Sequence, residues 1–317
     1  MNNNGQKFKD NIDDFKRNYH KNFYEILVPA LKGYEKKRKW SLFWAIFWTI
    51  LLNGLGILYF YCVITYHIEG RDVVKPGLYL IGFGITAYWM IKKGFENKIK
   101  EKIMKPLCSC FGNMTWSQIY SFIDANRFVE AGLFRQYSSY DVDDAFVGTY
   151  KECNIDIVEA EFTAGSGKNR STVFNGLLIK LDMNKKFKGH TLLMEDKLFH
   201  KSPLPNLRHT ELEDVVFEKK YDVFTDDEVE ARYILTPKLM EKLAKIKMAF
   251  RSKSIRCAFL DGQFLIAMEN HFLQDLFSLG SLTKPVSDPK QFTRLCRQFC
   301  SVLALIDHFE LYQDAVL

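Results

Sequence analysis

Two stretches near the start of the chain are long, apolar and free of charged residues. The first runs from Ser41 to Tyr66 and the second from Gly77 to Ile91. As helices they would span about 39 Å and about 22 Å, against roughly 30 Å of hydrocarbon in a bilayer. This pattern predicts a transmembrane helical hairpin over residues 41–91. A re-entrant or interfacial helix is the alternative for the shorter second segment.

Basic residues flank this hairpin on both sides, whereas the short loop inside it has no net charge. Because the cytoplasmic flanks of membrane helices carry an excess of lysine and arginine, both termini are expected in the cytoplasm. The flanking side chains are also candidate contacts for anionic lipid headgroups. The alternative is that they only set the orientation of the hairpin. They are Lys36, Lys37, Arg38, Lys39, Lys92 and Lys93.

Amphipathic helical arms are predicted on both sides of the hairpin, over residues 1–40 and, with a linker, over residues 92–140. Apolar residues recur there every three or four positions, which places them on one helical face. They are Phe8, Ile12, Phe15, Tyr19, Phe23, Ile26 and Ala30 in the first arm, and Phe95, Ile99, Ile103 and Leu107 in the second. The two apolar faces should be buried together, or either arm could lie on the lipid surface. In the linker, Thr115 can cap a short helix that contains Ile119, Phe122 and Ile123.

The pattern changes to strands in residues 141–317, which we expect to form a cytoplasmic α+β domain. Residues 171–183 alternate between apolar and polar, and Asp261-Gly262 between two apolar runs predicts a hairpin. Thr236-Pro237 and Asp288-Pro289 each combine an N-cap with a first-turn proline and predict two helices. Further strands are expected within 145–163, near 190–194, over 215–224 and over 230–235. The predicted fold is a mostly antiparallel sheet of about six to eight strands with capping helices.

Composition and charge narrow the class of protein. The seven cysteines are odd in number and lack framework spacing, which disfavours a secreted, disulfide-rich domain. The mean hydropathy of −0.16 averages over the two apolar stretches and a polar remainder. The net charge is +5 for residues 1–40, zero for residues 41–90 and +4 for residues 91–106. Because the whole chain carries +6, residues 107–317 carry a net charge of −3. Because nucleic-acid binding needs a basic surface on the folded domain, no nucleic-acid partner is expected.

Two short motifs suggest ligand binding but lack the groups that it requires. Gly165-Ser-Gly-Lys168 has neither the first glycine nor the final Ser/Thr of a P-loop, and it lies between strands, so a hairpin loop is favoured. Asp141, Asp143 and Asp144 could bind calcium. The glycine and glutamate of an EF-hand are missing, and a turn before the first strand is favoured.

Cysteine pairs and one polar residue in the first apolar stretch have similarly plain explanations. Cys108 with Cys110, and Cys296 with Cys300, could each supply two metal ligands, but no histidine or second pair completes a site, so small core residues are favoured. Asn53 could mark a conduction path, but one interhelical hydrogen bond is favoured. We therefore assign no catalytic residue, metal ion or cofactor.

Three segments of the chain carry a family resemblance. They are YDVDDAFVGTY, VFNGLLIKLDMNKKFKGHTLLMED and FEKKYDVFTDDEVEARYILTPKLMEKL, of which ARYILTPKLMEKL is the most specific. The chain resembles the bacterial family called domain of unknown function 3137, and the resemblance covers most of the chain, including the charged N-terminal arm and the paired spans. The resemblance implies a multi-pass protein of the bacterial inner membrane. It implies no activity, cofactor or catalytic residue.

These observations favour a membrane-tethered, non-enzymatic module that binds a protein partner or lipid headgroups. The alternative is a membrane-bound enzyme whose site is formed by residues far apart in the sequence, and a transporter or channel subunit ranks behind both. A cleft with converging carboxylates or histidines of perturbed pKa would favour the enzyme. Residues 107–317 should fold without the apolar stretches, because they contain apolar faces of their own.

Overall fold

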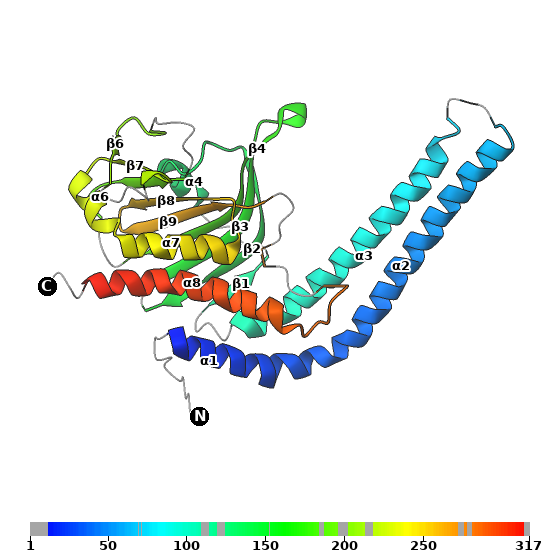
Figure 1. Cartoon of the computed structure of the whole chain (residues 1–317), viewed down its shortest axis with the longest axis horizontal. Helices are drawn as coiled ribbons and strands as arrows, with labels where there is room; N and C mark the ends of the chain where they lie inside the picture. The colour runs from blue at the N-terminus through cyan, green and yellow to red at the C-terminus, as the bar shows by residue number, and fades with distance from the viewer. Residues whose placement is uncertain are drawn as a thin grey trace. The chain divides into compact units, whose positions relative to one another are not determined.

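The structure is a computed structural model that describes residues 12–68, 70, 72–108, 114–118, 124–151, 153–183, 187–195, 202–212, 218–271, 276–277 and 281–313. The chain divides into two compact units (Figure 1). The sheet unit contains Met1–Tyr19, Cys108–Phe277 and Thr293–Leu317. The helical unit contains His20–Leu107 and Ser278–Phe292. Each unit is therefore assembled from segments that are far apart in the sequence.

Long helices dominate the first third of the chain. α1 spans Ile12–Asn22, a π-helical segment spans Phe23–Leu27, α2 spans Val28–Thr65 and α3 spans Lys75–Cys108. Pro29 lies in the first turn of α2, which continues directly from the π-helical segment, and because proline has no N–H it cannot donate a hydrogen bond to the preceding helical turn. The π-helical segment directly before it is the one irregularity in this run of described helix.

The apolar faces of both predicted arms are buried in the protein. Of the described members of the first face, Phe15, Tyr19 and Phe23 are at most 5% exposed, whereas Ile12 is half-buried. The members of the second face, which are Phe95, Ile99, Ile103 and Leu107, are at most 7% exposed. Leu27 and Leu31, which were not among the predicted positions, are buried as well. Within the helical unit, the Phe23 ring packs on Phe292 with the ring centroids 4.3 Å apart. Phe8 and the side chains of Ile26 and Ala30 lie outside the described part.

Two glycines lie at the contact between α2 and α3. A Cβ at Gly56 would come within 2.8 Å of Ile81 Cγ1, and a Cβ at Gly84 would overlap the amide of Asn53. Nothing lies within 4 Å of such a Cβ at Gly54 or at Gly82. The close approach of the two helices therefore depends on Gly56 and Gly84.

The polar bridge between these helices is made by Thr49 and not by Asn53, as had been expected. Asn53 Nδ2 donates to Thr49 O of its own helix at 2.7 Å, while Thr49 Oγ1 lies 3.3 Å from Gly84 O of α3. At the loop end, Tyr59 Oη donates to Val73 O at 2.8 Å. Asn53 therefore contributes shape against Gly84 and a bond within its own helix.

One described helix has the length and composition to cross a membrane. It is Leu31–Thr65, with 35 residues, and only 6% of its most apolar window is buried inside the protein. The predicted second crossing, over residues 77–91, lies within α3, which is not among the described helices of that kind. The structure thus supports one apolar helix, and the second crossing stays a prediction.

The sheet unit is built on nine antiparallel strands in the order β1-β2-β3-β4-β9-β8-β5-β7-β6. The two-residue turn between β8 and β9 is the predicted Asp261-Gly262, with both residues at positive φ, 48° and 76°. The strands are β1 Thr115–Ser117, β2 Ser139–Tyr150, β3 Cys153–Ala164, β4 Ser171–Asp182, β5 Thr191–Met194, β6 Arg208–Thr210, β7 Asp222–Thr225, β8 Ser254–Leu260 and β9 Gln263–Glu269.

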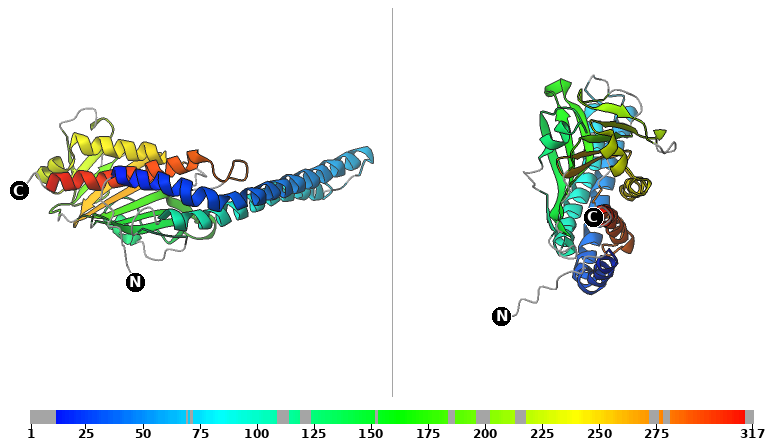
Figure 2. Two further views of the ribbon diagram at one scale, coloured as in Figure 1. Left: turned by 90° about the horizontal axis from the view of Figure 1, so that it is seen from below. Right: turned by 90° about the vertical axis from the view of Figure 1, so that its left-hand side faces the viewer.

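Helices cover both faces of the sheet. α7, Pro237–Phe250, and α8, Pro289–Gln313, lie side by side on one face (Figures 1 and 2). On that face Phe299 of α8 packs on Phe146 of β2, with ring centroids 5.0 Å apart. The other face buries a core around Phe128, which lies in the short helix α4, Ala125–Glu130. The predicted α+β class with an antiparallel sheet and capping helices is confirmed, although the sheet has nine strands where about six to eight were expected.

Both helices predicted from an N-cap residue followed by proline, at Thr236-Pro237 and Asp288-Pro289, are present. Thr236 caps α7 by accepting a hydrogen bond from the Leu239 N–H at 3.3 Å, and Pro237 occupies its first turn. Pro289 likewise begins α8 after Asp288. These local signals set the helix starts because each satisfies or removes an N–H that the helix itself leaves without a partner.

Two local predictions are wrong. Residues 230–235 were expected as a strand but fall mostly in the helix α6, Glu228–Ile234, because Asp227 caps it by accepting from the Glu230 N–H at 3.0 Å. Thr115 begins strand β1 and caps no helix, and residues 119–123 lie outside the described part. The strand expected over 215–224 is described only as β7, at its C-terminal end.

Candidate functional sites

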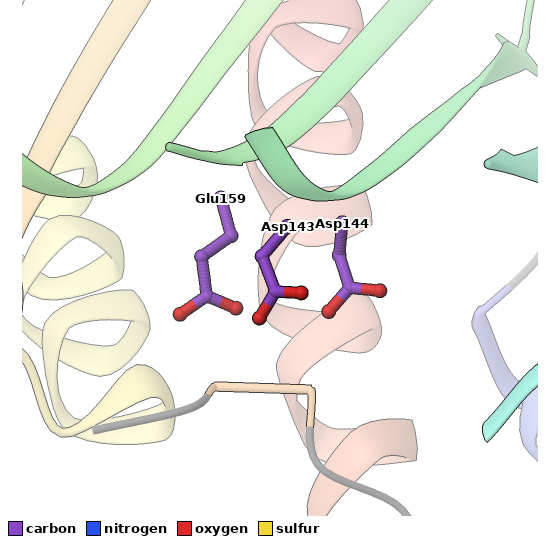
Figure 3. Close-up of side chains that lie close together, drawn as sticks. All are labelled: Asp143, Asp144 and Glu159. Atoms are coloured by element: carbon purple, nitrogen blue, oxygen red, sulfur yellow. The ribbon is translucent and has the colours of Figure 1, made fainter. Parts of the chain in front are cut away.

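A β-bulge in β2 brings three carboxylates together. The register passes from Val142 opposite Ala160 to Asp144 opposite Glu159, which leaves Asp143 as the extra residue. Consecutive side chains on a regular strand point to opposite faces, but the bulge lets Asp143 and Asp144 point the same way as Glu159 (Figure 3). One carboxylate oxygen from each residue lies within 4.8 Å of the others.

Part of this carboxylate cluster is engaged by protein donors. Trp116 Nε1 donates to Asp144 Oδ1 at 2.8 Å, and Asp144 is fully buried. Glu159, 7% exposed, accepts from the Leu276 N–H at 3.1 Å and from Asn270 Nδ2 at 3.2 Å. Asp143 is exposed. These bonds give the buried pair a structural role, because they tie Trp116 of β1 to Asp144, and Asn270 and Leu276 to Glu159.

The chemistry available to the carboxylate cluster is that of a hard cation site, because magnesium and calcium prefer oxygen ligands. The sequence interpretation of this region was wrong in two respects. Asp143 and Asp144 lie inside a strand and not in a turn, and Asp141 pairs with Glu161 away from the cluster. Glu159 was missed. A hairpin between the two halves of residues 139–164 would have placed it opposite Asp144.

The six basic residues predicted to contact lipid do not share one environment. Lys36, Lys37, Lys39 and Lys93 are exposed, and Lys92 is half-buried. Lys37 Nζ lies 5.0 Å from the Tyr34 ring centroid, and Lys92 Nζ lies 4.6 Å from that of Trp89. Both ammonium groups remain on partly aromatic surface, as is common near a bilayer interface. We call the five lysines the basic collar.

Arg38 differs from the lysines because its guanidinium is held inside the helical unit. The residue is 7% exposed, and its Nη1 donates to Leu282 O at 2.7 Å. Its Nε donates to the Glu35 carboxylate at 3.0 Å, and Glu35 Oε2 also accepts from the Val286 N–H at 3.2 Å. Arg38 and Glu35 therefore clasp the 281–287 segment, which the sequence could not show because that segment is more than 240 residues away.

The glycine-rich motif lies in the predicted connection between strands, whereas the cysteine pairs are only partly accounted for by core packing. Gly165-Ser-Gly-Lys168 is an exposed connection between β3 and β4 that includes one 3-10 turn, Gly167–Asn169. Cys108 is buried, and Cys110 lies outside the described residues. Cys296 and Cys300 lie on α8, with their sulfur atoms 4.0 Å apart.

Comparison with known proteins confirms the family resemblance over part of the chain. Residues 172–311 match the model of a family described as "Protein of unknown function (DUF3137)". This match covers β4 to β9, α6, α7 and nearly all of α8. A solved structure, the mycobacterial trehalose monomycolate transport factor A, is similar at 11% sequence identity and a TM-score of 0.32, over 65% of this chain and 96% of its own. No curated protein matches the chain significantly.

Proposed function

We propose that this protein is a membrane-tethered binding module that presents its sheet unit at the cytoplasmic face of a bacterial inner membrane. The observation that carries the proposal is the apolar helix Leu31–Thr65, of whose most apolar window only 6% is buried in the protein. This exposed apolar surface must be covered by a bilayer or by a partner protein, because apolar surface exposed to water is unfavourable. The sheet unit, by contrast, has both sheet faces covered.

A second crossing by residues 77–91 of α3 is the finer part of this proposal. It is supported by the close approach at Gly56 and Gly84 and by the Thr49 bond to Gly84 O. Both termini would then lie in the cytoplasm. Reporter fusions after Ala164 test this directly, with fusions in the 67–76 loop as the matched control. We expect only a cytoplasmic reporter to be active after Ala164 and only a periplasmic reporter to be active in the loop. The reverse result after Ala164 would show that α3 does not cross.

The basic collar is proposed to bind anionic headgroups where the helices leave the bilayer. Each exposed lysine near an anionic surface contributes about 1 kcal/mol, and salt screens it. Replacing Lys36, Lys37 and Lys39 by glutamine should therefore weaken binding to anionic lipid by about 3 kcal/mol, roughly a hundredfold. The full chain in nanodiscs of mixed neutral and anionic lipid provides the assay, with lipid enrichment measured by native mass spectrometry.

Arg38 is the matched control for that experiment because its guanidinium is already bound by Glu35 and the Leu282 carbonyl. Arg38→Gln should leave anionic lipid enrichment close to that of the unmodified chain.

A peptide of residues 6–40, which lacks the 281–287 segment, should bind anionic vesicles at low salt and release them as salt rises. Equal binding to neutral and anionic lipid would leave the collar with an orienting role alone.

An unidentified protein partner is the proposed ligand of the sheet unit. Val229 and Tyr233, four residues apart on α6, are 81% and 40% exposed and form a small apolar surface. Pull-down from detergent-solubilised membranes tests this, with Val229→Lys as the variant and Lys238→Glu as a charge-changing control on the neighbouring helix. A protein that the unmodified chain and the control retain, but that Val229→Lys loses, would support the assignment. Equal retention by all three would place the partner elsewhere.

An enzyme is the second candidate because the carboxylate cluster meets one criterion set for it, converging carboxylates. Such a site would hold a divalent cation between Asp143, Asp144 and Glu159. Calorimetric titration of the full chain with Mg²⁺, Ca²⁺ and Mn²⁺, compared with Asp143→Asn, tests it. Asp143 is the suitable change because it is exposed, whereas the other two residues hold neighbouring segments in place. Heat of binding that Asp143→Asn abolishes would favour the enzyme.

A further inference from the structure

Two thiols lie together on α8 near its middle. Cys296 and Cys300 are one helical turn apart, and their sulfur atoms are separated by 4.0 Å. Neither cysteine forms a disulfide. Cys296 is 6% exposed, whereas Cys300 is only partly buried, so the pair can be reached from the protein surface. A purely core-filling role would not need the second sulfur at the edge of the buried face.

The surroundings of Cys300 lower the pKa of its thiol below that of an ordinary cysteine. Its hydrogen bond with Cys296 lowers the pKa of the Cys300 thiol, and Lys16 of α1 lowers it further, against the opposing effect of burial. Asp13, which forms an ion pair with Lys16 at 3.2 Å, works in the other direction. The contrast is Cys257 of β8, which is fully buried and whose thiol pKa is raised well above its ordinary value. Thiolate is the form that binds metal ions.

We propose that Cys296 and Cys300 form a two-thiolate site for a soft monovalent metal ion of the Cu(I) class. Thiolates select soft ions, and Cu(I) is satisfied by two of them. Two metal–sulfur bonds of about 2.3 Å span at most about 4.6 Å when collinear, so a separation of 4.0 Å needs an angle of about 120° at the metal. A small rotation of either side chain opens the angle further.

Zinc is disfavoured by the number of ligands. A structural zinc ion takes four ligands, and even a catalytic one takes three from the protein. In the described part of the chain, the one group of three or more metal-binding side chains is the carboxylate cluster, which contains neither cysteine. Binding of Cu(I) forms two sulfur–metal bonds and breaks two sulfur–hydrogen bonds. Both protons pass to water, and no electron is transferred.

The test uses the full chain in detergent under anaerobic, reducing conditions, with Cu(I) supplied from a coloured chelator. We expect one Cu(I) per chain in competition with the chelator. Cys296→Ser and Cys300→Ser should each weaken binding beyond the roughly 10–100-fold that changes outside the ligand shell cause. Cys153→Ala, a buried cysteine in β3, is the matched control and should bind as the unmodified chain does.

A second measurement needs no substitution. Alkylation followed by peptide mapping should show that Cu(I) protects Cys300 from a maleimide, whereas Zn²⁺ at the same concentration does not. Unchanged alkylation of Cys300 with Cu(I) bound, or equal Cu(I) binding by the unmodified chain and by the Cys296→Ser/Cys300→Ser double variant, would overturn the proposal.

Discussion

Acidification should destabilise the sheet unit through His308 of α8. The residue is 2% exposed, and its Nε2 lies 3.4 Å from the Thr236 hydroxyl that caps α7. Burial, together with Lys242 and Lys238, lowers the pKa of His308 from 6.5 to about 4. The imidazole is therefore neutral in the folded protein at every pH above about 4, while in the unfolded chain it takes up a proton below about 6.5.

The magnitude follows from proton linkage. Because the unfolded state binds the extra proton between pH 6.5 and pH 4, the free energy of unfolding falls by up to about 1.4 kcal/mol for each pH unit in this window. From pH 7 to pH 5 the loss amounts to about 2 kcal/mol. The contribution is fully present above pH 6.5 and is lost as the pH falls.

Substitution of His308 separates its contribution to the pH dependence of stability from that of the Asp and Glu side chains, which also take up protons on acidification. Thermal unfolding of the full chain in detergent would be followed from pH 7 to pH 5 by circular dichroism, for the unmodified protein and for His308→Gln. His308→Gln should lower the melting temperature at pH 7 but flatten its decrease on acidification. Parallel curves for the two proteins would refute the reasoning, whatever their offset.

Three further predictions concern packing. Gly176→Ala should prevent normal pairing of β4 with β9, because a Cβ at this position would overlap the Met268 carbonyl oxygen. The free energy of unfolding should fall by several kcal/mol, which would be measured as a much lower melting temperature. Arg38→Ala should lower the free energy of unfolding by about 1–3 kcal/mol, because it removes charged hydrogen bonds to the Glu35 carboxylate and the Leu282 carbonyl. Backbone hydrogen exchange in residues 281–287 should then accelerate. Unchanged exchange would contradict the role of Arg38 in holding this segment. Residues 107–317 expressed alone should melt cooperatively, and an aggregated product would show that the arms complete the core.

Signals that act within a few residues were sufficient to predict several elements. Thr236-Pro237 and Asp288-Pro289 marked the starts of α7 and α8, and Asp261-Gly262 marked the turn between β8 and β9. Each depends on backbone groups of neighbouring residues, so it survives in any tertiary context. Residues 230–235 were assigned wrongly to a strand because Tyr233, Ile234 and Leu235 suit a strand by composition. The side chain of Asp227 caps a helix there instead.

Features that depend on distant partners were not predictable. The carboxylate cluster requires a bulge at Asp143, and a bulge leaves no fixed sequence mark. Arg38 was grouped with its lysine neighbours because its charge fits the collar. Its actual partner is the Leu282 carbonyl, brought near by the fold. The thiol pair was visible in the spacing of Cys296 and Cys300, but the exposure of Cys300 was not.

The strand order has a consequence for how the chain folds as it is made. β4 and β5 are consecutive in the sequence but are separated in the sheet by β9 and β8. A growing chain can therefore assemble β1 to β4 as a meander, and β5, β6 and β7 as a second group in which β7 lies between the other two, but the two halves stay unjoined until residues 254–269 have left the ribosome. The last hairpin synthesised is thus the one that closes the sheet. Until then, the edge strands β4 and β5 expose backbone N–H and C=O groups that have no partner strand. During this period, wrong pairing between nascent chains is favoured.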